Sequence, residues 1–261
     1  MVESWTPAFA GVTEFDVMNY LFSSRLDGLE ESATLAFADK VRQMQIAGKD
    51  IVDLTAGEPD FEVPPPIKQT AVNAIAAGRS KYISSRGLKD LRECIAVKLE
   101  KENEIQADPV KEIIVTPGAK QALFYAFMAL LNPGDEVLIP EPYWVSYKAM
   151  VELAGGVLKT IPTSEENGFK LMPQALEQAV TERTKILVLI NPCNPTGALL
   201  ERQDLQAIAE VVARHNLIVV TDEIYEKIIF DGKKLVSFAA LDNMSERTIT
   251  VNGFSKALAM T

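Results

Sequence analysis

Six short runs of apolar residues, each bounded by turn-forming residues, follow one another from Glu112 to the end of the chain. They lie at 112–116, 136–140, 157–161, 185–190, 217–221 and 248–251. The runs at 185–190 and 217–221 are apolar at nearly every position, a pattern typical of strands that are buried on both faces. We predict strands at these six positions and a further short strand at 51–54.

Apolar residues recur at helical spacing between most of these runs. The predicted helices cover 29–46, 66–77, 87–102, 119–131, 143–153, 173–180 and 201–215. Residues 1–28 show little periodicity and are expected to form a loosely held arm. Alternating strands and helices indicate an α/β fold, in which helices flank both faces of a mostly parallel sheet.

Composition narrows the class of protein. The 261 residues are 48% hydrophobic and 24% charged, which is typical of a globular chain, and their formal net charge is −10. A protein this acidic, without a basic stripe, is not expected to bind nucleic acid. The chain shows no signal peptide and no apolar stretch approaching the ~20 residues of a membrane span. We therefore expect a cytoplasmic protein without a membrane partner, whose Cys94 and Cys193 are reduced thiols.

Ligands of parallel sheets gather at the carboxyl ends of the strands, so the residues that follow each run are informative. After the run at 112–116, Gly118 opens a predicted helix whose first N–H groups could bind a phosphate, although an ordinary tight turn fits equally well. After 185–190, the segment Asn191–Gly197 (NPCNPTG) contains two Asn-Pro pairs. The prolines favour extended backbone at the preceding asparagines, which places their amide side chains at the strand end.

Two further strand ends carry charged residues. Asp222 closes an all-apolar strand, where a carboxylate is costly to bury unless it meets a cation, although it could equally cap the next helix. Lys256 precedes small and apolar residues, which favour the neutral amine that a Schiff-base nucleophile requires. Taken alone, Lys256 fits an ordinary surface lysine better. Together, a phosphate seat, amide donors, a buried carboxylate and a lysine are the groups that pyridoxal 5′-phosphate (PLP) requires.

Seven motifs then make the sequence resemble the fold-type-I, class I/II aminotransferases, and most of all the bacterial aspartate aminotransferases. They occur in the order of that family over roughly residues 26–261. The motifs are AGEPDF (Ala56–Phe61), KY (Lys81-Tyr82), PGAKQA (Pro117–Ala122), PYW (Pro142–Trp144), NPCNPTG (Asn191–Gly197), TDEIY (Thr221–Tyr225) and NGFSKALAMT (Asn252–Thr261).

The resemblance implies a role for each matching residue. Lys256 corresponds to the lysine that forms the internal aldimine with PLP and moves the proton between Cα and C4′. Asp222 corresponds to the carboxylate paired with the pyridinium nitrogen. Asn194 and Tyr225 correspond to the hydrogen-bonding partners of the phenolate oxygen, and Trp144 to the aromatic ring stacked on the cofactor.

Further positions correspond to contacts with the cofactor phosphate. Gly118, Ala119 and Lys120 lie at the phosphate-binding helix start, and Ser255 matches another phosphate contact. Tyr82 matches a contact donated across a dimer interface, so the resemblance implies a homodimer. It implies no metal site.

For the substrate, the resemblance implies contacts from Gly57, Trp144 and Asn194. Lys120 and a segment like Ser32–Thr34, with Thr34 as a candidate ligand, correspond to groups that bind the distal carboxylate of an acidic substrate. Ser32 and Thr34 would also fit a helix N-terminus. We expect L-aspartate, or a similar amino acid, and 2-oxoglutarate to be the substrates of a ping-pong reaction through aldimine and ketimine states.

Two departures from the family pattern qualify this prediction. Gly253 stands where the family often has a serine that contacts the phosphate. The family also continues beyond the equivalent of Thr261 with arginines that hold the phosphate and the substrate α-carboxylate, so we expect a C-terminally truncated form. The resemblance divides it into an arm with part of a small domain (1–56) and a PLP-binding large domain (57–261). The alternatives are a β-lyase or synthase of the same fold, or an inactive fragment or non-catalytic PLP-binding module.

Overall fold

The computed structural model describes residues 23–26, 33–53 and 57–261, and the side chains of Ser24 and of residues 33–36 lie outside this description. The strands are β1 (Glu136–Glu141), β2 (Val157–Pro162), β3 (Thr184–Ile190), β4 (Ile218–Asp222) and β5 (Thr248–Val251). The α-helices are α1 (Ala33–Ile46), α2 (Pro65–Ala76), α3 (Lys89–Asn103), α4 (Ala119–Leu130), α5 (Ser146–Leu153), α6 (Pro173–Ala179), α7 (Arg202–Arg214) and α8 (Phe254–Ala257). Short 3-10 helices are η1 (Ser24–Leu26), η2 (Glu165–Asn167), η3 (Phe238–Ala240) and η4 (Ser245–Arg247).

The five strands form one parallel sheet with the order β2-β1-β3-β4-β5. The chain moves outward from β1 to β2 and then returns to the other side of β1, so the strand order reverses between β1 and β3. In such sheets the crevice at this reversal, outside the carboxyl ends, is the ordinary ligand site. The predicted α/β fold with a mostly parallel sheet is confirmed.

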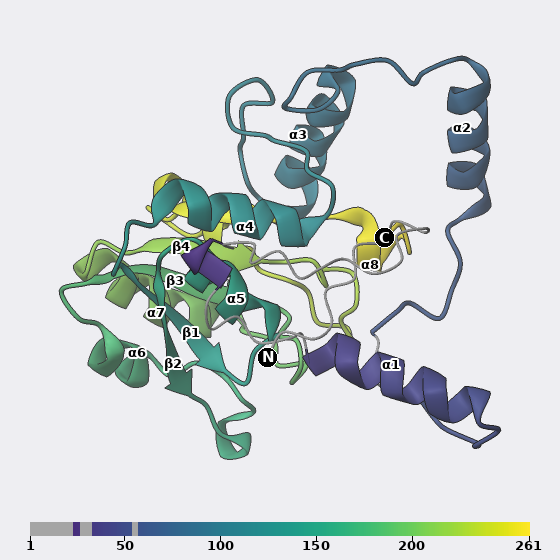
Figure 1. Cartoon of the computed structure of the whole chain (residues 1–261). Helices are drawn as coiled ribbons and strands as arrows, with labels where there is room; N and C mark the ends of the chain where they lie inside the picture. Colours follow the sequence, from purple (N-terminus) through teal and green to yellow (C-terminus); the bar gives the residue numbers. More distant parts are fainter. Residues whose placement is uncertain (1–22, 27–32, 54–56) are drawn as a thin grey trace.

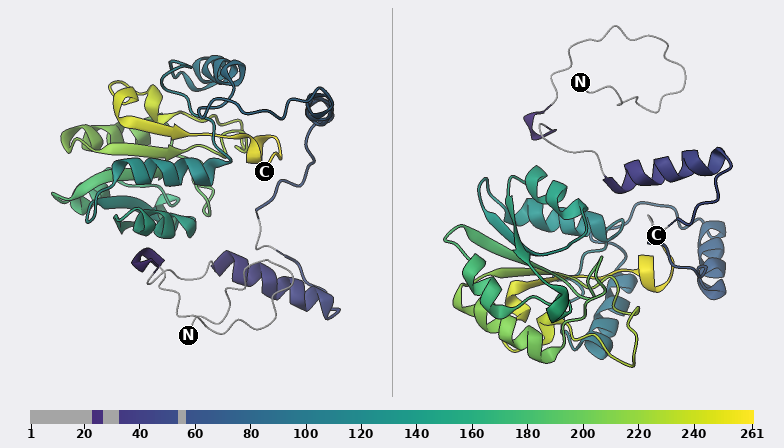
Figure 2. Two further views of the ribbon diagram at one scale, coloured as in Figure 1. Left: turned by 45° about the horizontal axis from the view of Figure 1, so that its top comes forward. Right: turned by 90° about the horizontal axis from the view of Figure 1, so that it is seen from below.

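Side chains alternate between the two faces of the sheet, and each face has its own core. On one face Leu187 and Val219 pack against residues of α6 and α7, such as Leu176 and Ile208. On the other face a second cluster joins the sheet to α4 and α5. Figure 1 shows the resulting helix–sheet–helix layers, and Figures 1 and 2 show α1 and α2 standing away from them. The all-apolar strands predicted at 185–190 and 217–221 are buried on both faces, as expected.

Two predicted strands are absent from the described structure. At 112–116 the chain forms turns and irregular backbone, and Ile114 is 62% exposed. A strand needs a ladder of bonds to a neighbour, whereas Val115 N–H donates only to the carbonyl of Arg86 (3.1 Å). The described part of the candidate at 51–54 is also irregular, and its Val52 is 85% exposed. Both runs are apolar, but neither pairs with a strand in the described structure.

Over the described residues the predicted helices agree with the structure to within three residues, and the largest difference is at α5, which begins at Ser146 rather than Tyr143. The predicted arm lies almost entirely outside the described residues. The division at residue 56 stays a prediction, and α2, which falls in the predicted large domain, buries none of its residues.

The assignment of the core predicts that truncating a buried isoleucine lowers the free energy of unfolding far more than truncating an exposed one. Ile208→Ala should lower the free energy of unfolding by about 2–5 kcal/mol, because Ile208 of α7 is fully buried and its removal leaves a cavity. Ile75→Ala on α2, where the side chain is 77% exposed, should change it by less than about 0.5 kcal/mol. Urea unfolding of both variants measures this difference, and equal losses would contradict the assigned core.

Candidate active site

The start of α4 offers an anion seat. Gly118 is its N-cap residue and has φ of 88°, in the region that favours glycine. No described side chain caps this helix, so its first N–H groups point outward with the positive end of the helix dipole. Ala119 and Lys120 form the first turn. This geometry agrees with the predicted phosphate seat, although the strand expected before it is replaced by irregular backbone.

Asp222, the last residue of β4, is buried, with 5% of its surface exposed. Its carboxylate accepts hydrogen bonds from the hydroxyl of Tyr147 (2.7 Å) and from the N–H of Ile224 (3.1 Å). Among the residues that the structure describes, neither Lys nor Arg forms an ion pair with it. Burial therefore raises the pKa of Asp222 despite these two bonds. A cationic ligand group would relieve that penalty.

Tyr147 was not identified from the sequence. It lies on α5, is fully buried, and packs edge-to-face against Trp144 with ring centroids 5.9 Å apart. Burial, reinforced by the charge of Asp222, raises the pKa of its hydroxyl, so Tyr147 acts as a neutral donor to Asp222. In the sequence it was one more residue of a predicted helix. The only available signal was the rule that a buried tyrosine hydroxyl finds a partner.

The two asparagines of the NPCNPTG segment have different roles. Asn191 is buried and closes the segment on itself, since its amide accepts from Leu200 N–H (2.8 Å) and donates to the Leu200 carbonyl (3.3 Å). Asn194 instead donates to the hydroxyl of Tyr225 (3.2 Å), which joins the ends of β3 and β4. Burial and the charge of Asp222 raise the pKa of Tyr225, so its hydroxyl keeps its proton.

Trp144 links the end of β1 to the start of α4. The amine of Lys120 lies 4.8 Å from the centroid of the Trp144 ring, within the range of a cation–π contact. Through the contacts of Trp144 with Tyr147 and of Tyr147 with Asp222, a continuous series of side chains joins the anion seat to the buried carboxylate.

Lys256 lies on α8, just after β5. Its amine donates to the carbonyl of Gly57 (2.7 Å), which joins residues that are far apart in the sequence. The ends of β4 and β5 are joined by a backbone bond from Glu223 N–H to the Val251 carbonyl (2.8 Å). The amine, the buried carboxylate and the Asn194–Tyr225 pair therefore come from neighbouring strand ends. Ser255 lies beside Lys256 on the same short helix.

The described structure does not bring Tyr82 to this place. Its side chain is fully exposed. Thr34 lies in α1, but its side chain is outside the described residues, as is all of Ser32.

Within the described ranges no group of three or more His, Cys, Asp and Glu side chains is arranged to hold a metal ion. No described helix is long and apolar enough to cross a membrane.

These groups suit a ligand with opposite charges at its two ends. The α4 N-terminus would bind an anion, Asp222 a buried cation, and Asn194 with Tyr225 an oxygen acceptor between them. Lys256 supplies a primary amine that can bond to a carbonyl carbon or carry a proton.

Comparison with known proteins identifies the family of the chain. A family model described as aminotransferase class I and II matches residues 49–261. The aspartate aminotransferase of Pyrococcus abyssi is 49% identical over 92% of this chain and 60% of its own length. The aspartate/prephenate aminotransferase of Thermus thermophilus is 44% identical over 92% of this chain and 61% of its own.

Solved structures give the same result. The structure of aspartate aminotransferase from Thermus thermophilus with maleate superposes with a TM-score of 0.88 at 44% identity, over 92% of this chain and 62% of that one. The chain spans about 60% of the length of the curated relatives that it matches. The match over residues 49–261 and the identities of these relatives establish that the chain belongs to the class I and II aminotransferase family.

Proposed function

We propose that this chain carries the site of a PLP-dependent aminotransferase that moves an amino group between L-aspartate, or a similar amino acid, and 2-oxoglutarate. The observation that carries the proposal is the buried Asp222 carboxylate, which has neutral donors and no cationic partner among the described residues. A protonated pyridine nitrogen is a cation that fits such a carboxylate. The family and the names of the relatives support amino transfer.

The other groups fit the remaining parts of the cofactor. The N–H groups at Gly118, Ala119 and Lys120 would hold the phosphate, with Ser255 adding a hydroxyl. Asn194 and Tyr225 both carry a proton to donate to the phenolate oxygen. Trp144 would cover the ring face. Bound PLP would supply the electron sink that makes the α-proton of an amino acid removable.

Lys256 would then have two tasks. Its amine is the group that would bond covalently to the cofactor and be released when an amino acid binds. Once free, the amine would accept the proton from the substrate Cα and deliver it to the C4′ position of the cofactor. The bond from Lys256 to the Gly57 carbonyl keeps the amine at the carboxyl edge of the sheet, where both tasks would take place.

Substrate selection would depend on the positive charge of Lys120. Lys120, held over Trp144, would attract the distal carboxylate of an acidic substrate, together with Thr34. Gly57, Trp144 and Asn194 would contact the part of the substrate nearest the cofactor. A β-lyase or synthase would use the same cofactor groups, but similarity to aspartate aminotransferases favours transamination. Assays for keto-acid formation and for ammonia release distinguish these reactions.

The assembly is proposed to be a homodimer in the cytoplasm. Tyr82, fully exposed here, would reach the phosphate site of a second copy. Size measurement of the purified protein tests this assembly, and a monomer at all concentrations would refute it.

Lys256→Ala should abolish covalent attachment of PLP. After incubation with PLP and reduction with borohydride, the unchanged chain should gain cofactor mass on the peptide containing residue 256, because only an imine at this amine is trapped there. The control Lys101→Ala, which alters an exposed lysine of α3, should label normally. Labelling of the Lys256→Ala variant at the wild-type level would refute the assignment.

Asp222→Asn should weaken PLP binding without lowering the stability of the fold. PLP affinity should fall about 100-fold or more, since removing one partner of a buried ion pair costs about 3–5 kcal/mol. The pKa of Asp222 is raised, so its ionisation destabilises the fold as pH rises above its unfolded value. Without PLP at pH 8, the asparagine variant should therefore be at least as stable as the unchanged chain.

Fluorescence titration with PLP and urea unfolding measure the two effects. Asp242→Ala, at an exposed position, is the control for loss of an acidic residue. Unchanged PLP affinity in Asp222→Asn would overturn the proposed pairing.

Lys120→Met should raise KM for L-aspartate at least about tenfold and have a smaller effect on KM for an uncharged amino acid, because a charged contact is worth about 1.5–3 kcal/mol. Steady-state assays with both substrates test this difference. Equal changes would mean that Lys120 acts on the cofactor rather than on substrate choice.

A further inference from the structure

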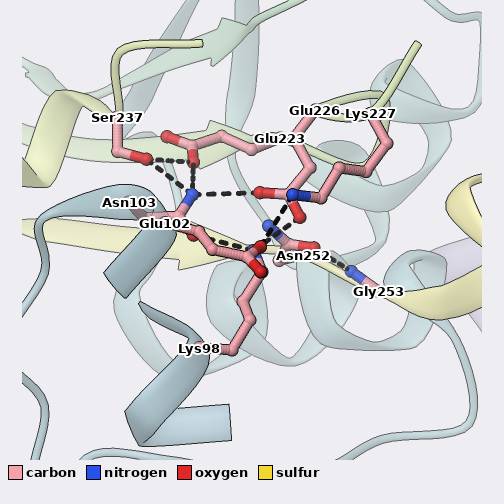
Figure 3. A network of polar contacts seen from close by, with 9 residues as sticks. All are labelled: Lys98, Glu102, Asn103, Glu223, Glu226, Lys227, Ser237, Asn252 and Gly253. Carbon is pink, nitrogen blue, oxygen red and sulfur yellow. Dashed lines mark hydrogen bonds and ion pairs between the residues drawn. The ribbon is translucent and has the colours of Figure 1, made fainter. Parts of the chain in front are cut away.

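A buried polar cluster lies beside the candidate active site and takes no part in the chemistry described above. It joins Lys98 and Asn103 of α3 to Glu223 and Glu226, which follow β4, and to Ser237 before η3 (Figure 3). We call these five residues the Asn103 cluster. Segments more than 100 residues apart in the sequence therefore meet in it.

Asn103 is the centre of the cluster and is 4% exposed. Its amide nitrogen lies within hydrogen-bond distance of Ser237 Oγ (2.9 Å), Glu226 Oε2 (3.0 Å) and Glu223 Oε2 (3.4 Å). Its amide oxygen accepts from the amine of Lys98 (2.7 Å). One side chain at the end of α3 thus holds two residues of the turn that follows Asp222.

The two carboxyl groups of the cluster are in different states. Glu226 pairs with Lys98 (2.5 Å), and although burial works to raise its pKa, the bonds from Lys98 and Asn103 outweigh burial and hold the pKa below its usual value. Burial raises the pKa of Glu223 to about 7, against opposing hydrogen bonds from Ser237 and the N–H of Phe238. Glu223 therefore changes its charge near neutral pH.

The charged groups around Glu223 do not neutralise it. From α3, Lys98 faces Glu226, and Glu102 pairs with Lys227 (2.7 Å). From its own turn, the charge of Glu226 raises the pKa of Glu223 further. Within the described ranges, Glu223 forms no ion pair with a basic residue.

The cluster is connected directly to the residues of the proposed site. Glu223 lies between Asp222 and Tyr225, and its backbone N–H bonds to Val251 at the end of β5. Ile224 packs so closely on Gly253 that a Cβ added at Gly253 would lie 2.9 Å from Ile224 Cδ1. Gly253 precedes Lys256 by three residues, so a shift of the Glu223 turn would also reach the turn that carries Lys256.

We infer that Asn103 and Glu223 are positioning residues, which hold the turns carrying Tyr225 and Lys256 in the arrangement that the proposed cofactor site requires. This inference rests on the proposed function. Neither residue touches the proposed reacting groups. Their contribution passes through the backbone of residues 223–226 and through the Ile224–Gly253 contact.

A buried polar cluster with an unpaired carboxyl is a poor source of stability, because apolar residues of the same shape often stabilise a fold as well or better. The alternative role for the cluster is an ordinary structural link between α3 and the sheet. A positioning role predicts that disrupting the cluster changes hydrogen exchange at the two turns and PLP binding. A purely structural link predicts a change in global stability alone.

The first experiment uses hydrogen exchange on the chain without cofactor. Asn103→Ala and Glu223→Ala should speed exchange about tenfold or more in the peptides covering 222–228 and 252–258, while α6 and α7 keep the wild-type rates. Glu223→Gln, which keeps a neutral hydrogen-bonding group, should preserve the wild-type rates at both turns. If the alanine variants fail to fold, the milder Ser237→Ala, which removes one hydroxyl, should show the same local pattern. A uniform change, or none at these turns, would overturn the inference.

The second experiment measures PLP binding as a function of pH. Glu223→Ala should weaken binding about tenfold, equivalent to about 1.4 kcal/mol, and the control Glu210→Ala on the exposed side of α7 should not. Glu223→Gln cannot ionise, so wild type and this variant should bind equally at pH 6. At pH 8, above the pKa of about 7, the wild type should bind more weakly than Glu223→Gln. A ratio of the two affinities that stays constant with pH would overturn the inference.

The two hypotheses fail differently. If the unchanged chain does not label at residue 256 with PLP and borohydride, the proposed function fails, and the positioning role fails with it. If it labels normally and the variants bind PLP and exchange hydrogen as the wild type does, only the positioning role fails.

Discussion

The burial of one carboxylate, Asp222, is the constraint around which the site is arranged. A strand that is apolar on both faces ends in this residue, which therefore leaves water without an ion-pair partner among the described residues. Two donors partly offset the penalty: the hydroxyl of Tyr147 on α5 and the N–H of Ile224. Both are neutral. A ligand that brings a positive charge would gain the free energy that folding leaves unrecovered, so the fold itself favours binding a cation at this point.

Most of the sheet could be predicted from the sequence because strands buried on both faces leave little choice of residue. The all-apolar runs of β3 and β4 are therefore visible without any structure. The strands predicted around Ile114 and Val52 are absent from the described structure for a different reason. An apolar run indicates β-propensity, but a strand also needs a neighbour to pair with, and the local sequence does not specify that neighbour.

The local sequence was enough to single out candidates that each follow one strand, as Asp222, Asn194 and Lys256 do. It was not enough for candidates defined by a contact between two distant residues. Tyr147 bonds to a residue 75 positions away, and Asn103 to one 120 positions away, so neither stood out in its own helix. Likewise, Gly253 is a departure from the family pattern when only the sequence is considered. The structure shows that a Cβ added at Gly253 would lie 2.9 Å from Ile224 Cδ1.

Asp222 and Glu223 are adjacent buried acids, and burial raises the pKa of both, yet they point in opposite directions from the end of β4. Among the described residues, Asp222 accepts hydrogen bonds from the Tyr147 hydroxyl and a backbone N–H, which leaves it suited to an external cation. Glu223 accepts hydrogen bonds from Ser237, Asn103 and a backbone N–H, which favour its charged form, and burial outweighs them and raises its pKa to about 7. The same desolvation thus acts on a carboxyl group suited to a ligand cation and on an adjacent carboxyl group held within the Asn103 cluster. Because Asp222 and Glu223 are adjacent on the backbone, a shift of Glu223 also shifts Asp222. This coupling connects the Asn103 cluster to the proposed cofactor site.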